Sequence, residues 1–242
     1  MNRSILAICA SSLLLVGCND PEMDKRIADL EGRVEALEAR PASPGGAKAA
    51  SPEQEQEAAN LLKAATEAAE AMDIETAKAK LEELKSKHGA TRAARAAQRL
   101  ESELAVIGKP EAELDVEKWF QGSAADVEGG KATLYVFWEV WCPHCKREVP
   151  KLSETYNKFK PQGLSMVGLT KQTRDVTDDQ VTAFVSEQHV SYPIAKENGD
   201  SLSQHYGVRG IPAAAMVKDG KVVWRGHPAR LTDEMISKWL GS

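Results

Sequence analysis

Apolar and polar positions follow a helical period near the N-terminus of the chain. Between residues 23 and 37 the apolar positions are separated alternately by four and three residues, which is the spacing of a coiled-coil seam. They are Met23, Ile27, Leu30, Val34 and Leu37. The run covers barely more than two heptads, and a helix of that length is marginal alone in water. We expect a stalk within residues 18–40, either a self-associating coiled coil through residues 23–37 or a single amphipathic helix.

The next part of the chain changes from a linker to a helical pattern. Residues 41–51 are rich in Pro, Gly, Ser and Ala and predict a flexible linker. Ser51 is placed as a helix N-cap, with Pro52 at the first helical position and Gln54 three residues on, as in a capping box. A helix should therefore begin at Pro52.

Residues 52–109 are rich in Ala, Glu and Lys, contain no aromatic residue, and show three apolar helical faces. Asp73 and Gly89 are the natural breaks between the three helices. The pattern resembles a fragment of a tetratricopeptide-type repeat, although the aromatic residues of that repeat are missing. We interpret the segment as a repeat-like helical hairpin that is either a passive spacer or a docking module.

Residues 110–242 alternate between strand and helix patterns and hold every Trp, Phe and Tyr of the chain. We expect strands at 132–138, 164–169 and 192–195, helices at 142–160, from Thr177 onward and at 231–240, and a hairpin at 213–225 around Asp219-Gly220. This order predicts an α/β domain with the thioredoxin fold, preceded by the all-α segment and the stalk.

Composition narrows the classes of function without naming one. The chain has 242 residues, 42% of them hydrophobic, and a net charge of −5. This is enough apolar material for one ordinary domain and a smaller one. The sequence has no basic stripe interleaved with aromatic residues, so we expect no nucleic-acid partner.

The first residues predict export and a lipid anchor. Residues 1–17 combine a short basic start with an apolar run that is too short to span a bilayer, as in a signal peptide. Leu15-Val16-Gly17-Cys18 resembles the lipobox of bacterial lipoproteins, in which the cysteine carries the lipid; an ordinary signal peptide is the alternative. We expect a protein held on the periplasmic or cell-surface side of a bacterial membrane through Cys18. Asn19 after that cysteine leaves the choice of membrane open.

Cysteine usage points to redox chemistry. Of the four cysteines, Cys9 leaves with the signal peptide and Cys18 carries lipid, so only Cys142 and Cys145 remain as thiols. An exported protein with a single Cys-x-x-Cys pair has no structural disulfide framework. The pair itself is therefore the candidate chemistry.

The position of the pair suits a nucleophile and a resolving thiol. Cys142 falls where a strand gives way to a helix, and the free N–H groups and dipole of the helix start favour its thiolate. Pro143 costs little there because it has no N–H to lose. Cys145, one turn deeper, is placed to resolve a mixed disulfide. We expect the Cys142 sulfur to be reachable at the mouth of the helix.

Other uses of the two cysteines fit less well. A zinc site needs two more ligands at metal spacing, and the sequence offers only scattered histidines. Covalent haem attachment needs His directly after the second cysteine, where Lys146 stands. A structural disulfide across one helical turn closes too small a loop to stabilise much. We expect no metal and no cofactor beyond a redox-active Cys142–Cys145 disulfide.

Residues from about Glu113 to Ser242 resemble the TlpA/ResA/CcmG branch of membrane-anchored thioredoxins. The residues that carry the resemblance are Phe137-Trp138, Trp141-Cys142-x-x-Cys145, Glu148-Val149-Pro150 and Gly210-Ile211-Pro212. The resemblance implies a thioredoxin fold and a thiol–disulfide oxidoreductase.

The resemblance also assigns residues to the site. It implies a cis peptide before Pro212, facing the cysteines, with the backbone of Ile211 free to pair with an extended client segment. Trp141, Pro143 and His144 would form the rest of the client-facing surface.

The same resemblance implies a proton acceptor beside the dithiol. Glu148 would lie buried next to the cysteines, raise the thiol pKa and exchange a proton with Cys145. Position 136, where classical thioredoxins have a buried Asp, is Val here. Glu139 is the second candidate for this role.

The direction of electron transfer stays open at this stage. Pro143-His144 is the dipeptide of the oxidant DsbA, and an imidazole beside the thiolate favours the reduced form; Glu148 acts the opposite way. The branch favours a reductant of client disulfides, such as apocytochrome or copper-site thiols, fed by a membrane redox partner. A DsbA-like oxidant and a copper chaperone using the same two cysteines are the alternatives. A peroxiredoxin is not expected, because Thr-x-x-Cys is absent.

Overall fold

The computed structural model describes residues 21–38 and 50–241, with side chains for 25–33 and 50–241. The chain divides into two compact units, residues 1–48 and 49–242, which are treated separately. The predicted signal peptide 1–17, the lipidation site Cys18 and all but the last two residues of the linker 41–51 lie outside the described residues. Within the described ranges, no helix is long and apolar enough to cross a bilayer.

In the first unit the structure describes one helix. Helix α1 (Pro21–Glu38) covers the predicted stalk. Ile27 and Leu30 on this helix are 48% and 55% exposed, so two positions of the predicted apolar seam are not covered by other described residues. Self-association through the seam stays a prediction.

Three helices open the second unit, as the sequence predicts. They are α2 (Pro52–Glu70), α3 (Ile74–His88) and α4 (Arg92–Leu104). Ser51 and Gln54 form the expected capping box, Asp73 caps α3 through a hydrogen bond from the N–H of Thr76, and Gly89 ends that helix. The helices pack through small residues and leucines, including Ala65, Leu84 and Ala97, none of which is exposed. This is a separate small core of alanines and leucines without an aromatic side chain.

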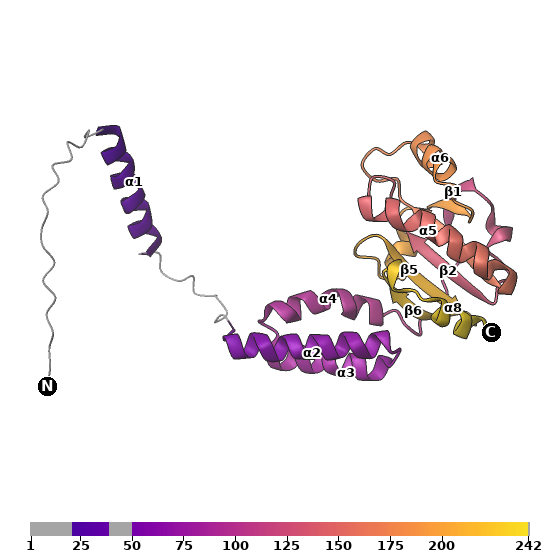
Figure 1. Ribbon diagram of the computed structural model, residues 1–242, viewed down its shortest axis with the longest axis horizontal. Coiled ribbons are helices and arrows are strands. Elements are labelled where there is room, and N and C mark those ends of the chain that lie inside the picture. Colours follow the sequence, from indigo (N-terminus) through magenta and orange to yellow (C-terminus); the bar gives the residue numbers. More distant parts are fainter. Residues whose placement is uncertain (1–20, 39–49, 242) are drawn as a thin grey trace, which may run out of the picture. The chain divides into compact units, whose positions relative to one another are not determined.

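The rest of the second unit is a mixed six-stranded sheet with helices on both faces (Figure 1). The strand order is β1-β4-β3-β2-β5-β6; β2, β3 and β4 run parallel, and β1, β5 and β6 are antiparallel to their neighbours. The strands are β1 (Val116–Gln121), β2 (Ala132–Phe137), β3 (Leu164–Thr170), β4 (Ile194–Glu197), β5 (Ala213–Lys218) and β6 (Lys221–Gly226). The helices are α5 (Pro143–Phe159), α6 (Asp178–Glu187), α7 (Ser201–His205) and α8 (Asp233–Leu240), with 3-10 turns at Ala124–Asp126, Lys160–Gln162 and Pro228–Arg230.

Both faces of the sheet are buried, and β2 shows why. Leu134 and Val136 point to the core under α5, α6 and α8, whereas Tyr135 and Phe137 point to the core under α7. A strand buried on both faces reads as a continuous apolar run, which is how 132–138 was predicted. The thioredoxin order of strands, hairpin and final helix is confirmed, and β2 is held between β3 and β5 at the centre of the sheet.

The residues directly after helix α4 are hydrogen-bonded to strand β6 of the sheet. The backbone N–H of Gly108 donates to the carbonyl of Val222 at 2.8 Å, and the N–H of Val222 donates to the carbonyl of Lys109 at 2.9 Å. Val106 is buried in the core under α7. The all-α segment therefore packs against β6 rather than ending before the domain.

Candidate active site

The two cysteines lie at the C-terminal end of the central strand. After β2, Cys142 is the N-cap of α5 and Pro143 is the first residue of the helix. The backbone N–H of Cys145 donates to the Cys142 sulfur at 3.3 Å, as a capping side chain accepts at a helix start. This donor and the helix dipole stabilise negative charge on that sulfur. Both thiols are free.

The Cys142 sulfur is less accessible than the sequence suggests. Cys142 is 4% exposed and Cys145 is fully buried, so the predicted order of depth is right, but the expected open mouth of the helix is not. The cause is the loop before β5, because the Cys142 sulfur lies 3.9 Å from the carbonyl oxygen of Ile211. A client disulfide must therefore approach between this loop and the start of α5.

The loop over Cys142 has the predicted backbone. The Ile211–Pro212 peptide is cis, as the resemblance implies. Pro212 is buried and Ile211 is half-buried. The structure therefore brings together Cys142, Cys145, Ile211 and Pro212 from segments about seventy residues apart.

Burial raises the pKa of the Cys145 thiol strongly. The hydrogen bond with Cys142 raises this pKa further, as do the charges of Cys142 and Glu139, while a backbone hydrogen bond from Glu139 acts in the opposite direction. Cys145 therefore stays protonated at neutral pH, and its attack on a mixed disulfide requires that its proton leave in that step.

Glu148 is mostly buried one helical turn beyond Cys145, and the interactions that the structure gives it are with Lys151 and His227. Its carboxylate pairs with Lys151 at 3.3 Å, and its side chain is 13% exposed. It acts electrostatically on His227, whose pKa burial lowers and Glu148 raises. The groups that act on the Cys145 pKa are instead Cys142 and Glu139. One turn beyond Cys145, Glu148 is thus on the side of α5 that faces His227.

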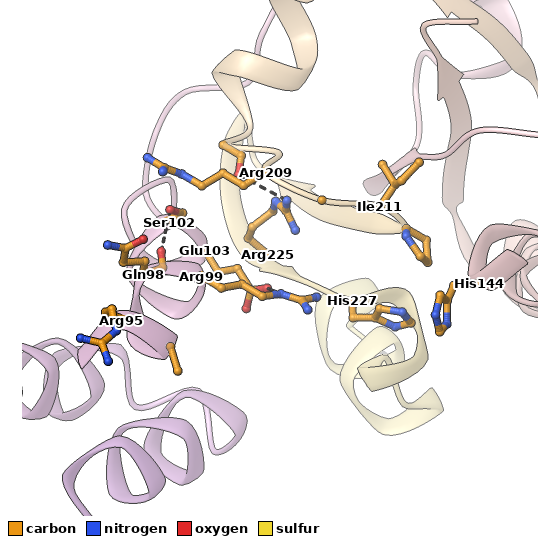
Figure 2. A pocket seen from close by; sticks show the side chains of 14 residues that line it. Arg95, Gln98, Arg99, Ser102, Glu103, His144, Arg209, Ile211, Arg225 and His227 are labelled. Carbon is orange, nitrogen blue, oxygen red and sulfur yellow. Dashed lines mark hydrogen bonds and ion pairs between the residues drawn. The ribbon is translucent and has the colours of Figure 1, made fainter. Parts of the chain in front are cut away.

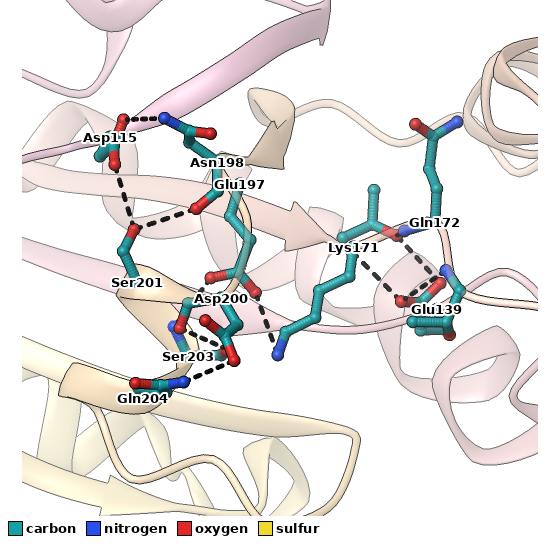
Figure 3. Close-up of polar contacts among 12 residues, drawn as sticks. Asp115, Glu139, Lys171, Gln172, Glu197, Asn198, Asp200, Ser201, Ser203 and Gln204 are labelled. Atoms are coloured by element: carbon teal, nitrogen blue, oxygen red, sulfur yellow. Dashed lines mark hydrogen bonds and ion pairs between the residues drawn. The ribbon is translucent and has the colours of Figure 1, made fainter.

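Glu139 is the buried carboxyl group beside the dithiol. It is 4% exposed. One side-chain oxygen accepts a hydrogen bond from the Thr170 hydroxyl at 3.1 Å; the other accepts from the backbone N–H groups of Lys171 and Thr173 at 3.2 and 3.3 Å (Figure 3). Its own carbonyl accepts from the N–H of Cys142 at 3.1 Å. Glu139, the second candidate in the sequence, ties the residues before Cys142 to the loop after β3.

That loop covers Trp141, a contact that sequence reasoning missed. The indole N–H of Trp141 donates to the Thr173 hydroxyl at 3.0 Å, and the Arg174 guanidinium lies 3.5 Å from the centre of the ring. Cation–π stacking at this distance is favourable. Arg174 has φ +61°, so the stacking accompanies a left-handed backbone conformation. No periodic pattern in 171–176 could have revealed the loop.

His144 faces solvent between the two cysteines. The Arg147 guanidinium lies 2.6 Å from Nδ1 of His144. A guanidinium only donates, so Nδ1 accepts this hydrogen bond and a proton on the ring lies at Nε2. Pro143 is exposed next to it. Pro143 and His144 are exposed beside the cysteines, and their contact with a client stays a prediction.

This fold and this site define a thioredoxin-like domain with a Cys-x-x-Cys pair at the start of its first sheet-covering helix. Residues 109–225 match the sequence model of the AhpC/TSA family. The C-terminal domain is therefore similar to that family, and its relatives are consistent with the TlpA/ResA/CcmG branch.

Curated relatives carry names that describe thiol chemistry. The thiol-disulfide oxidoreductase ResA of Bacillus cereus is 35% identical over 112 residues, which are 46% of this chain and 62% of the relative. ResA of Halalkalibacterium halodurans is 26% identical over 111 residues, 46% of this chain and 61% of the relative. The sporulation thiol-disulfide oxidoreductase A of Bacillus subtilis is 22% identical over 110 residues, 46% of this chain and 67% of the relative. The chain spans only about 60% of the two ResA proteins.

Among solved structures, a thioredoxin-like protein in the oxidized form aligns over 56% of this chain and 97% of its own, with 21% identity and a TM-score of 0.48.

Proposed function

We propose that the protein is an extracytoplasmic thiol–disulfide oxidoreductase that works through Cys142 and Cys145. The observation that supports this most is the pair of free sulfurs at the N-terminus of α5, one capped by an N–H and the other buried behind it. The relatives named as thiol-disulfide oxidoreductases agree with this proposal.

The proposed reaction moves two electrons to a client disulfide. The Cys142 thiolate attacks one client sulfur, the client disulfide breaks, and the other client sulfur leaves as a thiolate that takes up a proton. Cys145 then loses its proton and attacks the Cys142 sulfur. The mixed disulfide breaks, the second client thiol leaves, and Cys142–Cys145 is left as a disulfide. A membrane redox partner must reduce it again.

The test is insulin reduction by the full chain. Wild-type protein in dithiothreitol should precipitate insulin chains faster than dithiothreitol alone, and Cys142→Ser should abolish that gain. Retained activity in Cys142→Ser would refute the proposal. The matched control is Ser153→Ala, which also changes a polar side chain of α5. The Ser153 hydroxyl accepts a hydrogen bond from the backbone N–H of Ser191, outside the dithiol.

We place the protein as a reductant of client disulfides on the outer side of a bacterial membrane, held by lipid on Cys18. An oxidant like DsbA is the second candidate, favoured by the exposed His144 between the cysteines. Alkylation of thiols in intact cells followed by gel shift decides between them. Cysteines found mostly reduced support the reductant, and cysteines found mostly as disulfide support the oxidant.

A copper chaperone is the third candidate, because two adjacent free thiols suit Cu(I). Within the described residues, no group of three or more His, Cys, Asp or Glu is placed to hold a metal. Titration of the reduced protein with Cu(I) against a competing chelator separates this function from redox chemistry. Binding that is tight and lost in both Cys142→Ser and Cys145→Ser would favour the chaperone.

A further inference from the structure

A groove runs from the loop that covers Cys142 to the all-α segment. Its volume is about 610 Å³, within the roughly 300–1,000 Å³ of ligand sites in proteins. One end is formed by His144, Ile211 and Pro212, and Ile211 is the residue whose carbonyl lies next to the Cys142 sulfur. The other end is formed by α4, beginning at Arg95 (Figure 2). The groove therefore leads away from the point where a client disulfide must bind.

The wall contributed by α4 is fixed in place. Gly207 approaches this helix so closely that a Cβ atom there would lie 3.1 Å from the carbonyl oxygen of Ser102. The Arg230 guanidinium donates to the Glu103 carboxylate across the same junction. The groove is thus made jointly by the helical segment and the thioredoxin-like domain.

The lining carries an excess of positive charge. Four arginines line the groove, and Glu103 is its one acidic residue. That carboxylate is already used twice, because one oxygen accepts from Arg99 at 3.1 Å and the other accepts from Arg230. Arg95, Arg209 and Arg225 form no ion pair within the described part of the chain, although the charge of Glu103 also acts on buried Arg225.

These three arginines differ in how they are held. Arg225 is buried and donates to the carbonyls of Tyr206, Gly226 and Gly207, at 2.8, 3.1 and 3.4 Å. Arg209 is exposed and forms no hydrogen bond or ion pair with any described residue, and exposed Arg95 bonds only the Ala90 carbonyl. Figure 2 shows Arg209 and Arg225 between α4 and the loop that carries Ile211. The groove thus has one buried guanidinium with three hydrogen bonds, one exposed guanidinium with a single hydrogen bond and one exposed guanidinium with none among the described residues.

We infer that this groove binds an acidic polypeptide segment of the client, so that the helical segment selects clients with Asp or Glu near the reacting disulfide. Carboxylates form bidentate hydrogen bonds with guanidinium groups, and a groove of one charge attracts segments of the other. The inference rests on the proposed function for the reaction, but the binding itself does not depend on the cysteines of the client.

The test compares three peptides with the full chain at low ionic strength. Each contains one disulfide with flanking residues that are all Asp/Glu, all Ser/Asn or all Lys, and a second fluorescent set has Ser in place of Cys. Reduction of the first set is followed by thiol release, and binding of the second set by fluorescence anisotropy. We expect the acidic peptide to be reduced about tenfold faster than the neutral one, and this preference to fall as salt rises.

Variants locate the effect in the groove. Arg95→Gln with Arg209→Gln should bring the acidic-to-neutral ratio close to one. Arg92→Gln with Lys109→Gln removes the same charge from α4 and the segment after it, outside the groove, and should keep the preference. Equal rates for acidic and neutral peptides in the wild type, or equal loss of preference in both double variants, would overturn the inference. Binding of the acidic Ser peptide without reduction of any disulfide peptide would instead refute the proposed function. It would still support the inference that the groove binds acidic segments.

Discussion

The chemistry of the site depends on how the thiols of Cys142 and Cys145 and the carboxyl group of Glu139 act on one another. The Cys142 sulfur accepts a hydrogen bond from the backbone N–H of Cys145 at the start of α5. The Cys145 thiol is fully buried, and burial raises its pKa. Glu139 acts on Cys145 through its charge and through a backbone hydrogen bond, which have opposite effects on that pKa. The two sulfurs are thus made different although they are three residues apart.

The first prediction concerns the different reactivity of the two thiols. In the reduced full chain, iodoacetamide should label Cys142 well before Cys145, because only the thiolate reacts and burial raises the pKa of Cys145. Labelling of Cys145 should stay slow up to pH 9, above the ordinary thiol pKa of about 8.5. Peptide mass spectrometry after timed quenching measures both sites. Equal labelling at pH 7 would contradict the assigned roles.

The second prediction separates the two candidate carboxyl groups. In a Cys142→Ser background, Glu139→Gln should shift the pH profile of Cys145 alkylation to lower pH, because a negative charge that raises the Cys145 pKa is removed. The amide oxygen of Gln can still accept from Lys171 and Thr173, so the loop should keep its position. Glu148→Gln should leave the profile unchanged. A shift in Glu148→Gln alone would restore the role that the resemblance implies.

Local sequence patterns predict the positions of some residues of the site but not of others. The strand-to-helix position of Cys142 and Pro143 is local, and so both could be predicted from residues 132–145. Glu139 meets Thr170, Lys171 and Thr173 across more than thirty residues of chain, and no pattern around Glu139 carries that information. The role of Glu148 is implied by the resemblance and stays a prediction, because its one ion pair, with Lys151, leaves that role open.

At the scale of elements, the caps were predicted well and the edge of the sheet was not. The capping box Ser51–Gln54 is local and is present as predicted, and the helix expected from Thr177 begins with a second capping box, Thr177–Gln180. Strand β1 was not predicted, because it carries exposed charged residues and pairs with β4 through two irregularities of register. Such an edge strand has no clean alternation to reveal it.

The third prediction concerns the junction between α4 and the sheet. Glu103 is 4% exposed, and Arg99, Arg225 and Arg230 all act around it. Arg99 and Arg230 are 64% and 34% exposed, so only the carboxylate side of these pairs is buried. Glu103→Gln should lower the free energy of unfolding by about 1–3 kcal/mol, because it weakens charge-assisted hydrogen bonds to a buried side chain.

The control lies on the same helix. Glu101 pairs with Lys85 at 3.5 Å in a partly exposed position. Glu101→Gln should change the free energy of unfolding by less than about 1 kcal/mol. Urea denaturation followed by tryptophan fluorescence reports on the thioredoxin-like domain alone, since every Trp lies beyond residue 110. An equal effect of both substitutions would show that α4 does not stabilise that domain.

At the scale of the whole molecule, the helical segment contributes to the surface beside the dithiol. The spacer interpretation of residues 52–109 leaves out that α4 forms one wall of the groove beside Cys142. The sequence could not show this, because the wall depends on residues 95–103 lying against 207–227 in three dimensions.

The fourth prediction tests the stalk. If the seam in α1 associates, the full chain should sediment as an oligomer in detergent, and Ile27→Lys with Leu30→Lys should reduce it to a monomer by placing charge in an apolar seam. Glu31→Lys, a change at an exposed polar position of the same helix, is the control and should keep the oligomer. A monomeric wild-type protein would leave α1 a single amphipathic helix.

The most direct test of the central claim is which cysteine holds a trapped client. Reduced full-chain protein is mixed with a disulfide peptide, quenched with acid and weighed by intact mass spectrometry. Cys145→Ser should accumulate a mixed disulfide with the peptide on Cys142, because the attacking sulfur is present and the resolving sulfur is not. Cys142→Ser should accumulate none. A mixed disulfide in Cys142→Ser as abundant as in Cys145→Ser, or none in either variant, would contradict the account.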